Sequence, residues 1–506
     1  MESSIAGRRD LHFVLIPWLG TSHTIPMIDI GRLLAERGGV TVTIVMTPAN
    51  AAQLKPTIDH IATSGLPIRF VFLPFPSVEV GLPEGCEHGQ PACLRHDAEP
   101  LRRIKLLRQP LEELLREQAL APSCIICGAY YPWTPAVARV LGIPCFVFHG
   151  FGSFALFCMH NLYRYRPHER ASSPTEPFLL PGLPFQFEIA RQQLPVHFQL
   201  LPHFMEMCNE VREGELRSTP SLESARVLTE LSMDGVLVNS FDDLEPGYAE
   251  RLAAASGKKV YTIGPVSLCY RSGRLDMADR GKKLSVDASW CLDWLDSMKP
   301  RSVIYVSFGS LGSLASEQLM ELGYGLLASN RPFIWAINGV EAVEEWMQEK
   351  LEKGGVDPKC LLIRGWAPQV MILSHPAVGG FLTHCGWNST LESASAGVPM
   401  ATWPLVAEQF LNQKLIVDAV GIGVAVGVKT SMRRPEQAAE EGTAVKREEI
   451  AEVVERLMDG REEGEERRRR AKEFAAKASK TVVTGGSSYD NVTRLIQLVA
   501  TQRSRR

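Results

Sequence analysis

The sequence predicts an α/β protein built from two Rossmann-like domains that face a cleft. The 506 residues, of which 45% are hydrophobic and 22% are charged, are too many for a single compact core. Short apolar runs alternate with longer amphipathic stretches, which is the pattern of parallel strands joined by helices. Because this pattern occurs on both sides of a polar segment, we expect two domains of the same class.

The first domain is expected to span residues 1–265. Helical patterns at 25–37 and 134–141 lie between apolar runs, and the predicted strands are LHFVLIPW, VTVTIVMT, IRFVFLPF, CIICGAYYPW, IPCFVF, GVLVNS and KVYTIGP. Cys124 and Cys127 have the spacing of a redox or zinc pair. Since no second pair or histidine lies at ligand spacing, buried strand cysteines are the favoured interpretation.

Residues 266–286 are polar and basic without a hydrophobic period, which predicts a surface linker. The second domain is expected at 287–485, with the strands RSVIYVSFGS, PFIWAI, CLLIRGW, VGGFLTHCG and PMATWP. The charged runs 433–441 and 462–470 are interpreted as solvated surface. Residues 486–506 have a helical period and are expected to form a helix that crosses back to the first domain.

The charge balance favours a small, uncharged partner. Lys and Arg total 54 against 57 Asp and Glu, so nothing in the net charge of −3 attracts nucleic acid or an anionic membrane. Residues 1–10 lack the apolar core of a signal peptide, and the run that follows them is too short to span a bilayer. We therefore expect a cytoplasmic protein without membrane insertion, acting as a monomer.

The segment from Trp366 to Gln409 carries the strongest chemical signal. The predicted strand GGFLTH ends at His384, and a helix begins near Trp387. A helix N-terminus presents unpaired N–H groups and a partial positive charge, which suits a diphosphate without requiring a metal. Gly386 allows the backbone to approach such a group closely. On local grounds alone, the same pattern also fits an ordinary N-capped helix.

This segment resembles the signature box of the plant secondary-product UDP-glycosyltransferases in length, order and nearly every distinctive position. The similarity includes CLDWLDSMKPRSVIYVSFGS and the histidine-containing turn after the first strand, so it covers essentially the whole chain. It implies the GT-B architecture, with the acceptor in the first domain and the UDP-sugar in the second. The implied reaction is inverting transfer of a sugar, with glucose favoured, onto a small lipophilic plant metabolite.

The resemblance also implies roles for residues of the box. Trp366 would stack on uracil, while Ala367 and Gln369 would hydrogen-bond the edge of the base. Glu392 would accept from the ribose hydroxyls. The diphosphate would be held by His384, Asn388, Ser389 and Ser310, and the sugar by Trp387, Glu408 and Gln409. In this family Gln at the end of the box is associated with glucose, whereas His is associated with galactose.

Two missing motifs narrow the chemistry. No Asp-x-Asp triplet occurs in the chain, so the usual carboxylate pair that holds a metal on a sugar diphosphate is absent. We expect neither a metal site nor a cofactor, with the UDP-sugar as a co-substrate. No G-x-G-x-x-G follows the first strand, which argues against the other use of Rossmann-like domains, a nicotinamide oxidoreductase.

His23, in the turn WLGTSHTIPM, is the candidate general base. A histidine in this place could also be a capping or surface residue, but its position matches the catalytic histidine of the family. The family places an Asp at the position of Gly128, where it orients that histidine. No Asp or Glu lies between Glu117 and Glu169, so His23 acts alone, borrows a distant carboxylate such as Asp97 or Glu99, or is helped by an acidic acceptor.

The missing Asp leaves three alternatives open. These are an O-glucosyltransferase of acidic acceptors, a C-glycosyltransferase acting on an electron-rich ring, and a weak or non-catalytic binder of UDP-sugar and lipophile. Apolar residues of the first domain are expected to line the acceptor site, although each one alone is more often a core residue. They are Ile25, Leu82, Phe148 and Phe151, with Trp18, Phe75, Phe154 and Phe157 in the same rows. Flavonoids, phenolics, triterpenoids and steroids fit such a pocket.

Overall fold

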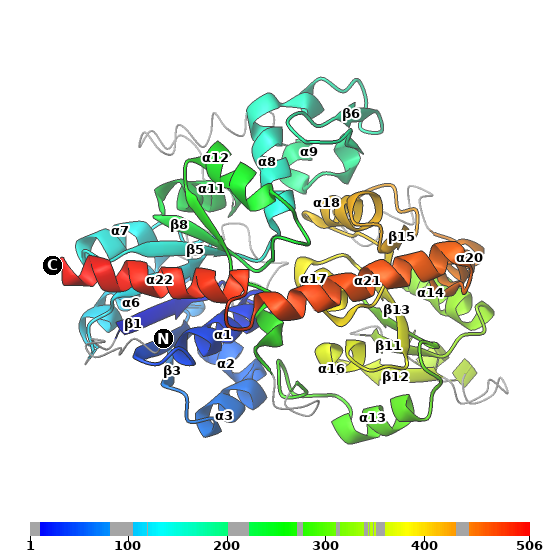
Figure 1. Ribbon diagram of the computed structural model, residues 1–506, viewed down its shortest axis with the longest axis horizontal. Coiled ribbons are helices and arrows are strands. Elements are labelled where there is room, and N and C mark those ends of the chain that lie inside the picture. Colours follow the sequence, from blue (N-terminus) through cyan, green and yellow to red (C-terminus); the bar gives the residue numbers. More distant parts are fainter. Residues whose placement is uncertain are drawn as a thin grey trace.

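The protein consists of two lobes, each built around a parallel sheet covered by helices (Figure 1). The computed structural model describes residues 11–80, 105–118, 120–200, 222–270, 277–309, 314–337, 343, 345–347, 349–350, 360–431 and 445–505. In both sheets every pair of neighbouring strands is parallel, as the alternation of strands and helices predicts.

The first sheet has the strand order β3-β2-β1-β4-β5-β8-β9. The order reverses between β1 and β4, and ligands of open α/β sheets bind where this happens, at the carboxyl ends of the strands. The central strands are buried on both faces, which explains their continuous apolar sequences. The strands are β1 (Leu11–Ile16), β2 (Val40–Met46), β3 (Ile68–Phe72), β4 (Cys124–Gly128), β5 (Cys145–His149), β8 (Gly235–Val238) and β9 (Lys259–Thr262).

Helices cover both faces of this sheet, and a small hairpin, β6 (Pro177–Leu179) and β7 (Glu188–Ala190), lies beyond them. Helix α1 begins at Thr21, four residues before the predicted helix, because the Gly20 carbonyl already accepts from His23 N and Thr24 N. The helices are α1 (Thr21–Ala35), α2 (Pro48–Gln53), α3 (Lys55–Thr63), α6 (Arg108–Arg116), α7 (Thr134–Val140), α8 (Ser153–Tyr165), α9 (Val196–Leu200), α11 (Leu222–Ser232) and α12 (Tyr248–Ser256).

The second sheet has the order β12-β11-β10-β13-β14-β15. Its strands are β10 (Val303–Ser307), β11 (Phe333–Ile337), β12 (Cys360–Arg364), β13 (Val378–Thr383), β14 (Met400–Thr402) and β15 (Gly423–Ala425). Its helices are α13 (Ala288–Asp296), α14 (Ser316–Ala328), α16 (Gln369–Leu373), α17 (Trp387–Ala396), α18 (Gln409–Lys414), α20 (Arg447–Met458) and α21 (Glu462–Thr481). The switch between β10 and β13 sets the N-terminus of α17 at the carboxyl edge that faces the first lobe (Figure 1).

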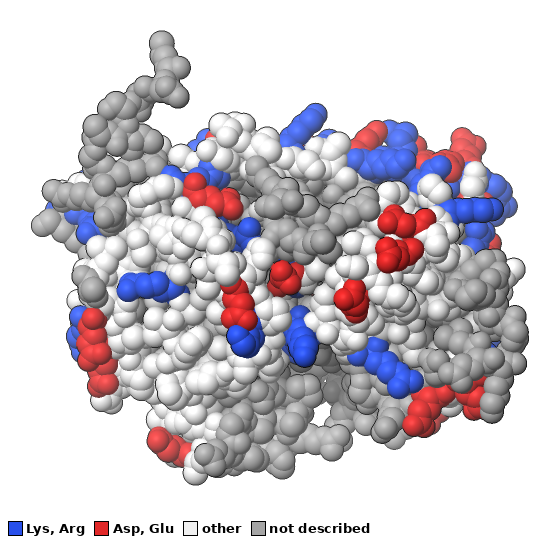
Figure 2. Space-filling model, turned by 90° about the horizontal axis from the view of Figure 1, so that it is seen from below, with Lys and Arg blue, Asp and Glu red and all other residues white. Residues whose placement is uncertain are grey.

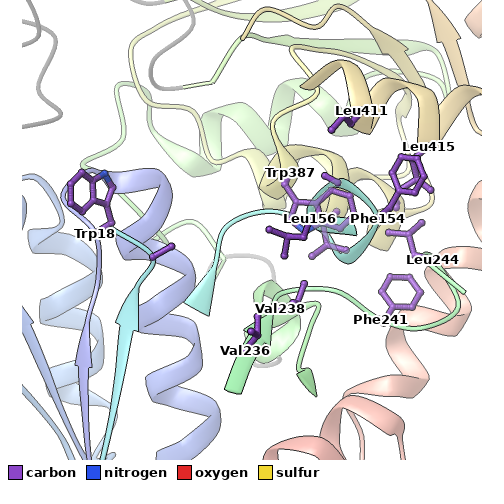
Figure 3. Packing of buried hydrophobic residues seen from close by; sticks show 14 of the residues in the cluster. Trp18, Phe154, Leu156, Val236, Val238, Phe241, Leu244, Trp387, Leu411 and Leu415 are labelled. Atoms are coloured by element: carbon purple, nitrogen blue, oxygen red, sulfur yellow. The ribbon is translucent and has the colours of Figure 1, made fainter. Parts of the chain in front are cut away.

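The two lobes share apolar packing. Figure 3 shows Trp387 of α17 beside Phe154 and Leu156 of α8, with Leu411 and Leu415 of the second lobe near them. Helices α21 and α22 (Ser487–Ser504) run end to end across both lobes (Figure 1). Helix α22 packs on the first lobe, where Asn491 Nδ2 donates to the carbonyl oxygen of Thr262 at 2.9 Å. The chain therefore ends against the lobe in which it begins.

Charges of both signs lie on the face of the molecule that Figure 2 shows. On the face shown in Figure 2, basic and acidic side chains are interspersed among uncharged residues. Within the described ranges, no helix combines the length and the apolar character needed to cross a membrane. Cys124 and Cys127 lie buried in β4 as free thiols, which confirms the interpretation as strand residues.

The described part of the predicted linker, residues 277–286, is not a detached surface segment. Thr57 Oγ1 of α3 lies 2.7 Å from Gly281 N, and Ser285 N donates to the carbonyl oxygen of Trp366 at 3.1 Å. The Arg280 side chain is buried. Composition predicted a solvated linker because it records polarity but not the hydrogen-bond partners that a fold supplies.

Candidate active site

The N-terminus of α1 holds His23 against the second lobe. Pro26 lies inside α1 and has no N–H, so the Ser22 carbonyl four residues earlier lacks its usual helical donor. Asn388, at the start of α17, supplies the missing bond because its Nδ2 donates to the Ser22 oxygen at 2.7 Å. One hydrogen bond therefore joins the turn that carries His23 to helix α17, which lies within the signature box.

His23 is half-buried among rings and backbone rather than beside a carboxylate. The Tyr130 ring meets it edge-on with the centroids 6.3 Å apart, and a Cβ placed on Gly150 would lie 3.2 Å from its Nδ1. Burial, together with the neighbouring His149, lowers the pKa of His23 to about 4. In the part of the chain that the structure describes, no carboxylate contributes to this shift. His23 is therefore a neutral proton acceptor at pH 7.

Gly128 ends β4, at the position where the resemblance implies an Asp. A Cβ at this position would lie 2.8 Å from the backbone nitrogen of Trp18, closer than real contacts allow. The rings of Tyr130 and Tyr131, with centroids 4.7 and 5.3 Å from that of Trp18, hold the tryptophan in place. The backbone after β1 thus occupies the space that a side chain would need. Asp97 and Glu99, the alternative carboxylates, lie outside the described residues.

The backbone of the turn between β13 and α17 is held in an uncommon conformation. Cys385 has φ of 63°, an uncommon conformation for a residue with a side chain, and Asn412 Nδ2 holds its carbonyl at 2.9 Å. The His384 ring lies between Gly309 and Gly386, where a Cβ at Gly309 would come within 2.6 Å of it. Burial lowers the pKa of His384 to about 4, so it offers a phosphate a neutral N–H rather than a positive charge.

The predicted nucleoside ligands lie together beside α17. Gln369 Nε2 lies 3.0 Å from Ser389 Oγ and donates to Glu392 Oε2 at 2.8 Å. The Trp366 side chain is half-buried next to them, while the backbone of Ala367 is covered. The structure brings these residues to one end of the second sheet, and Ser310 lies outside the described residues.

The predicted sugar ligands differ in their surroundings. Trp387 is 2% exposed, and its Nε1 donates to the carbonyl oxygen of Asn239 at 2.7 Å, so its ring belongs to the interface between the lobes. Glu408 is buried and accepts from Asn412. Gln409 accepts from Leu405 N and Val406 N through Oε1, which leaves its Nε2 as the group to offer a ligand.

The predicted acceptor residues divide between core and pocket wall. Ile25 and Phe148 are enclosed by the core of the first lobe, as are Phe154 and Phe157, so they support a pocket from behind rather than line it. Phe151 is half-buried and stacks on His149 with the centroids 6.3 Å apart. Trp18 and Phe75 are buried as well, and Leu82 lies outside the described residues.

Sequence reasoning missed three residues of this site. Arg280 of the linker forms buried ion pairs with Asp29 of α1 and with Glu392. Asn412 orders the turn after β13. The alternation of strands and helices carries no signal for contacts between such distant positions. Across the described residues, no three His, Cys, Asp or Glu side chains gather at metal-binding distance.

The comparisons with known proteins agree with this geometry. Residues 281–441 match the family model described as UDP-glucoronosyl and UDP-glucosyl transferase. UDP-glycosyltransferase 73C6 of Arabidopsis thaliana is 43% identical over 96% of both chains, and UDP-glycosyltransferase 73D1 of the same plant is 43% identical over the full length of both. The chain belongs to the UDP-glycosyltransferases.

Solved structures of plant UDP-glycosyltransferases confirm the GT-B fold. Glycyrrhiza uralensis UGT73P12, complexed with glycyrrhetinic acid 3-O-monoglucuronide, superposes with a TM-score of 0.85 at 37% identity, over 98% of this chain and 96% of that one. Phytolacca americana UGT2, complexed with UDP-2fluoro-glucose and pterostilbene, gives 0.71 at 27% identity, over 97% of this chain and all of that one. This UDP-glycosyltransferase is an enzyme that transfers a glycosyl group from a UDP-sugar to small molecules.

Proposed function

We propose that this UDP-glycosyltransferase transfers glucose from UDP-glucose, with inversion and without a metal, to a hydroxyl of a small lipophilic acceptor, and that His23 is the general base. The observation that carries the proposal is the bond between Asn388 and the Ser22 carbonyl, because it holds the turn with His23 against the helix N-terminus that would receive the diphosphate. Gln409, with its amide nitrogen left for a ligand, supports glucose as the sugar.

The chemistry follows from the groups in place. Neutral His23 takes the proton of the acceptor hydroxyl while the oxygen bonds to the anomeric carbon from the face opposite UDP. The bond between that carbon and the β-phosphate oxygen breaks, and UDP leaves with the electron pair. The N-terminus of α17 and the His384 N–H stabilise the charge on the leaving diphosphate. Inversion of an α-linked donor gives a β-linked product.

The surroundings of His23 favour an acidic acceptor. A base whose pKa is about 4 removes a proton poorly from an aliphatic alcohol, but less poorly from a phenol, whose pKa is about 10 as in tyrosine. Gly128 leaves no room for a carboxylate that would strengthen the base. An electron-rich ring that accepts the sugar at carbon also needs no strong base for the bond to form, so C-glycosylation is the second candidate. The triterpenoid bound to UGT73P12 and the stilbenoid bound to UGT2 mark the two acceptor classes to compare.

The test is turnover of UDP-glucose with phenolic, flavonoid, triterpenoid and steroid acceptors by wild type and by His23→Gln. Glutamine keeps the polarity and approximate size of the side chain but cannot take the proton. We expect a β-glucoside whose formation falls by about 10²–10⁴-fold in the variant, with UDP affinity by calorimetry unchanged.

Four other results of this assay would contradict part of the proposal. A product resistant to acid hydrolysis identifies C-glycosylation. UDP-glucose binding without turnover of any acceptor identifies a non-catalytic binder. Equal turnover by both proteins excludes His23 as the base, and an α-linked product excludes inversion.

A further inference from the structure

The Arg280 guanidinium binds two carboxylates, one from a helix of each lobe. Its Nη1 donates to Glu392 Oε1 of α17 at 2.7 Å, while its Nη2 and Nε donate to Asp29 Oδ2 of α1 at 2.8 and 3.0 Å. The side chains are 8% exposed for Arg280, 0% for Asp29 and 7% for Glu392. Charges buried this deeply are costly unless paired, so removal of one partner leaves a strong imbalance.

The Glu392 carboxylate is held at both oxygens. Arg280 occupies one side of Oε1, and Gln369 Nε2 donates to Oε2. Two carboxylate oxygens offer about four acceptor positions, so the two that remain can accept from two neighbouring hydroxyls. Donors fixed on both oxygens leave the carboxylate one orientation.

The same segment supports the neighbouring indole. Gly281 has φ of +117°, and a Cβ there would lie 2.7 Å from Trp366 Cε2, so the backbone packs directly against the ring. Lys282 Nζ lies 5.9 Å from the Trp366 ring centroid, and Ser285 Oγ accepts from Trp366 N at 2.8 Å. The linker thus contacts Trp366 and Glu392, two of the residues proposed to hold the nucleoside.

Helix α1 connects this arrangement to the base. Asp29 lies six residues after His23, which is about 9 Å along the helix axis. Helix α1 is connected to the second lobe at two points. Ser22 accepts a hydrogen bond from Asn388, and Asp29 is linked to Glu392 through Arg280. Asn388 and Glu392 are one turn apart on α17. Two contacts therefore hold α1 and α17 in a fixed relation.

We infer that Arg280 is a positioning residue of the ribose subsite, which orients Glu392 toward the nucleotide's hydroxyls and ties that carboxylate through Asp29 to the helix carrying His23. The inference rests on the proposed function, because that function assigns the ribose to Glu392. Arg280 itself touches neither the sugar nor the acceptor. Its loss should therefore weaken recognition of the ribose hydroxyls and raise KM for UDP-glucose more than it lowers kcat.

The test compares the binding of UDP and of 2′-deoxyuridine diphosphate by calorimetry in wild type, Arg280→Gln and Arg280→Lys. We expect wild type to bind UDP about 10-fold more tightly than the deoxy ligand, and Arg280→Gln to lose most of that preference. Lysine keeps the buried positive charge but lacks the planar guanidinium that donates to both carboxylates at once. Arg280→Lys should therefore retain part of the preference for UDP. Arg331→Gln, which removes a surface pair with Glu455, is the matched control and should keep the wild-type preference.

A structural role alone predicts a different result. If Arg280 only held the lobes together, both ligands would lose affinity by the same factor and the preference would survive, which would overturn the inference. If the wild type bound both ligands equally, Glu392 would not contact the ribose hydroxyl, and the inference would be wrong. Because the assay needs no turnover, these results are distinct from a failure of His23 as the base. If Arg280→Gln does not fold, as shown by thermal unfolding, Arg280→Lys decides the question by the same comparison.

Discussion

Gly128→Ala probes the space at the end of β4, where the resemblance to plant UDP-glycosyltransferases implies an Asp. The added Cβ would lie 2.8 Å from Trp18 N and 3.0 Å from Trp18 Cβ, so the tryptophan must move by about 0.6 Å to reach an ordinary contact of 3.4 Å. Its ring is wedged against Tyr130 and Tyr131, and the preceding Ile16 is paired with Cys127 in the sheet. We expect a cost of about 1–3 kcal/mol in the free energy of unfolding.

Thermal unfolding measures this cost. For a unit the size of the first lobe, Tm falls by about 2–4 °C for each kcal/mol. Gly460→Ala is the control, because a Cβ there meets nothing within 4 Å and Tm should not change. Gly128→Asp should lose at least as much stability and should raise the pKa of His23 above about 4, moving the acidic limb of kcat/KM upward. An unchanged Tm in Gly128→Ala would refute the steric explanation.

Three further predictions follow from titration and from the residues of the site. Since burial lowers the pKa of His23 to about 4, the reactive neutral form persists in acid, and kcat/KM should fall only as pH drops toward 4; a midpoint near 6.5 would show an unshifted base. Burial raises the pKa of Glu245 to about 7, so between pH 4.5 and 7 the native state binds a proton that the unfolded state does not, and the stability of the wild type should decline as pH rises through this range. Glu245→Gln should abolish this contribution to the pH dependence of Tm. Parallel curves of Tm against pH for the two proteins would contradict the prediction. Turnover should be unchanged by EDTA, whereas loss restored by Mg²⁺ or Mn²⁺ would exclude metal independence.

The alternation of apolar runs predicted every strand of the two parallel sheets except β15, because strands such as β10 and β13 are buried on both faces and form continuous hydrophobic segments. Strand β15 has only three residues, Gly423–Ala425. The boundaries were less accurate where a polar turn carries the start of a helix. The predicted helix at 25–37 is α1 at Thr21–Ala35, since its first turn consists of polar residues and no hydrophobic period marks it.

The donor site was predictable to the extent that its residues are contiguous. His384, Asn388 and Glu392 lie within one strand, turn and helix, so their spacing alone places them together. Arg280 and Asp29 are 251 positions apart, and only the meeting of α1 with the linker brings them into contact. Local composition marked Arg280 as surface because an arginine in a polar segment is usually solvated, whereas two buried carboxylates stabilise it here.

The proline of α1 has a consequence for turnover. If the lobes separate, the Ser22 oxygen exchanges the Asn388 amide for water, and a bond of this kind differs from its hydrated state by only about 0.5–1.5 kcal/mol. The contact between Ser22 and Asn388 can therefore hold the turn that carries His23 and still break at thermal energies. In a helix with its full set of internal bonds this oxygen would already accept one donor, and a charged pair in its place would be harder to separate. The missing helical bond thus gives the two lobes a contact that can form and break repeatedly.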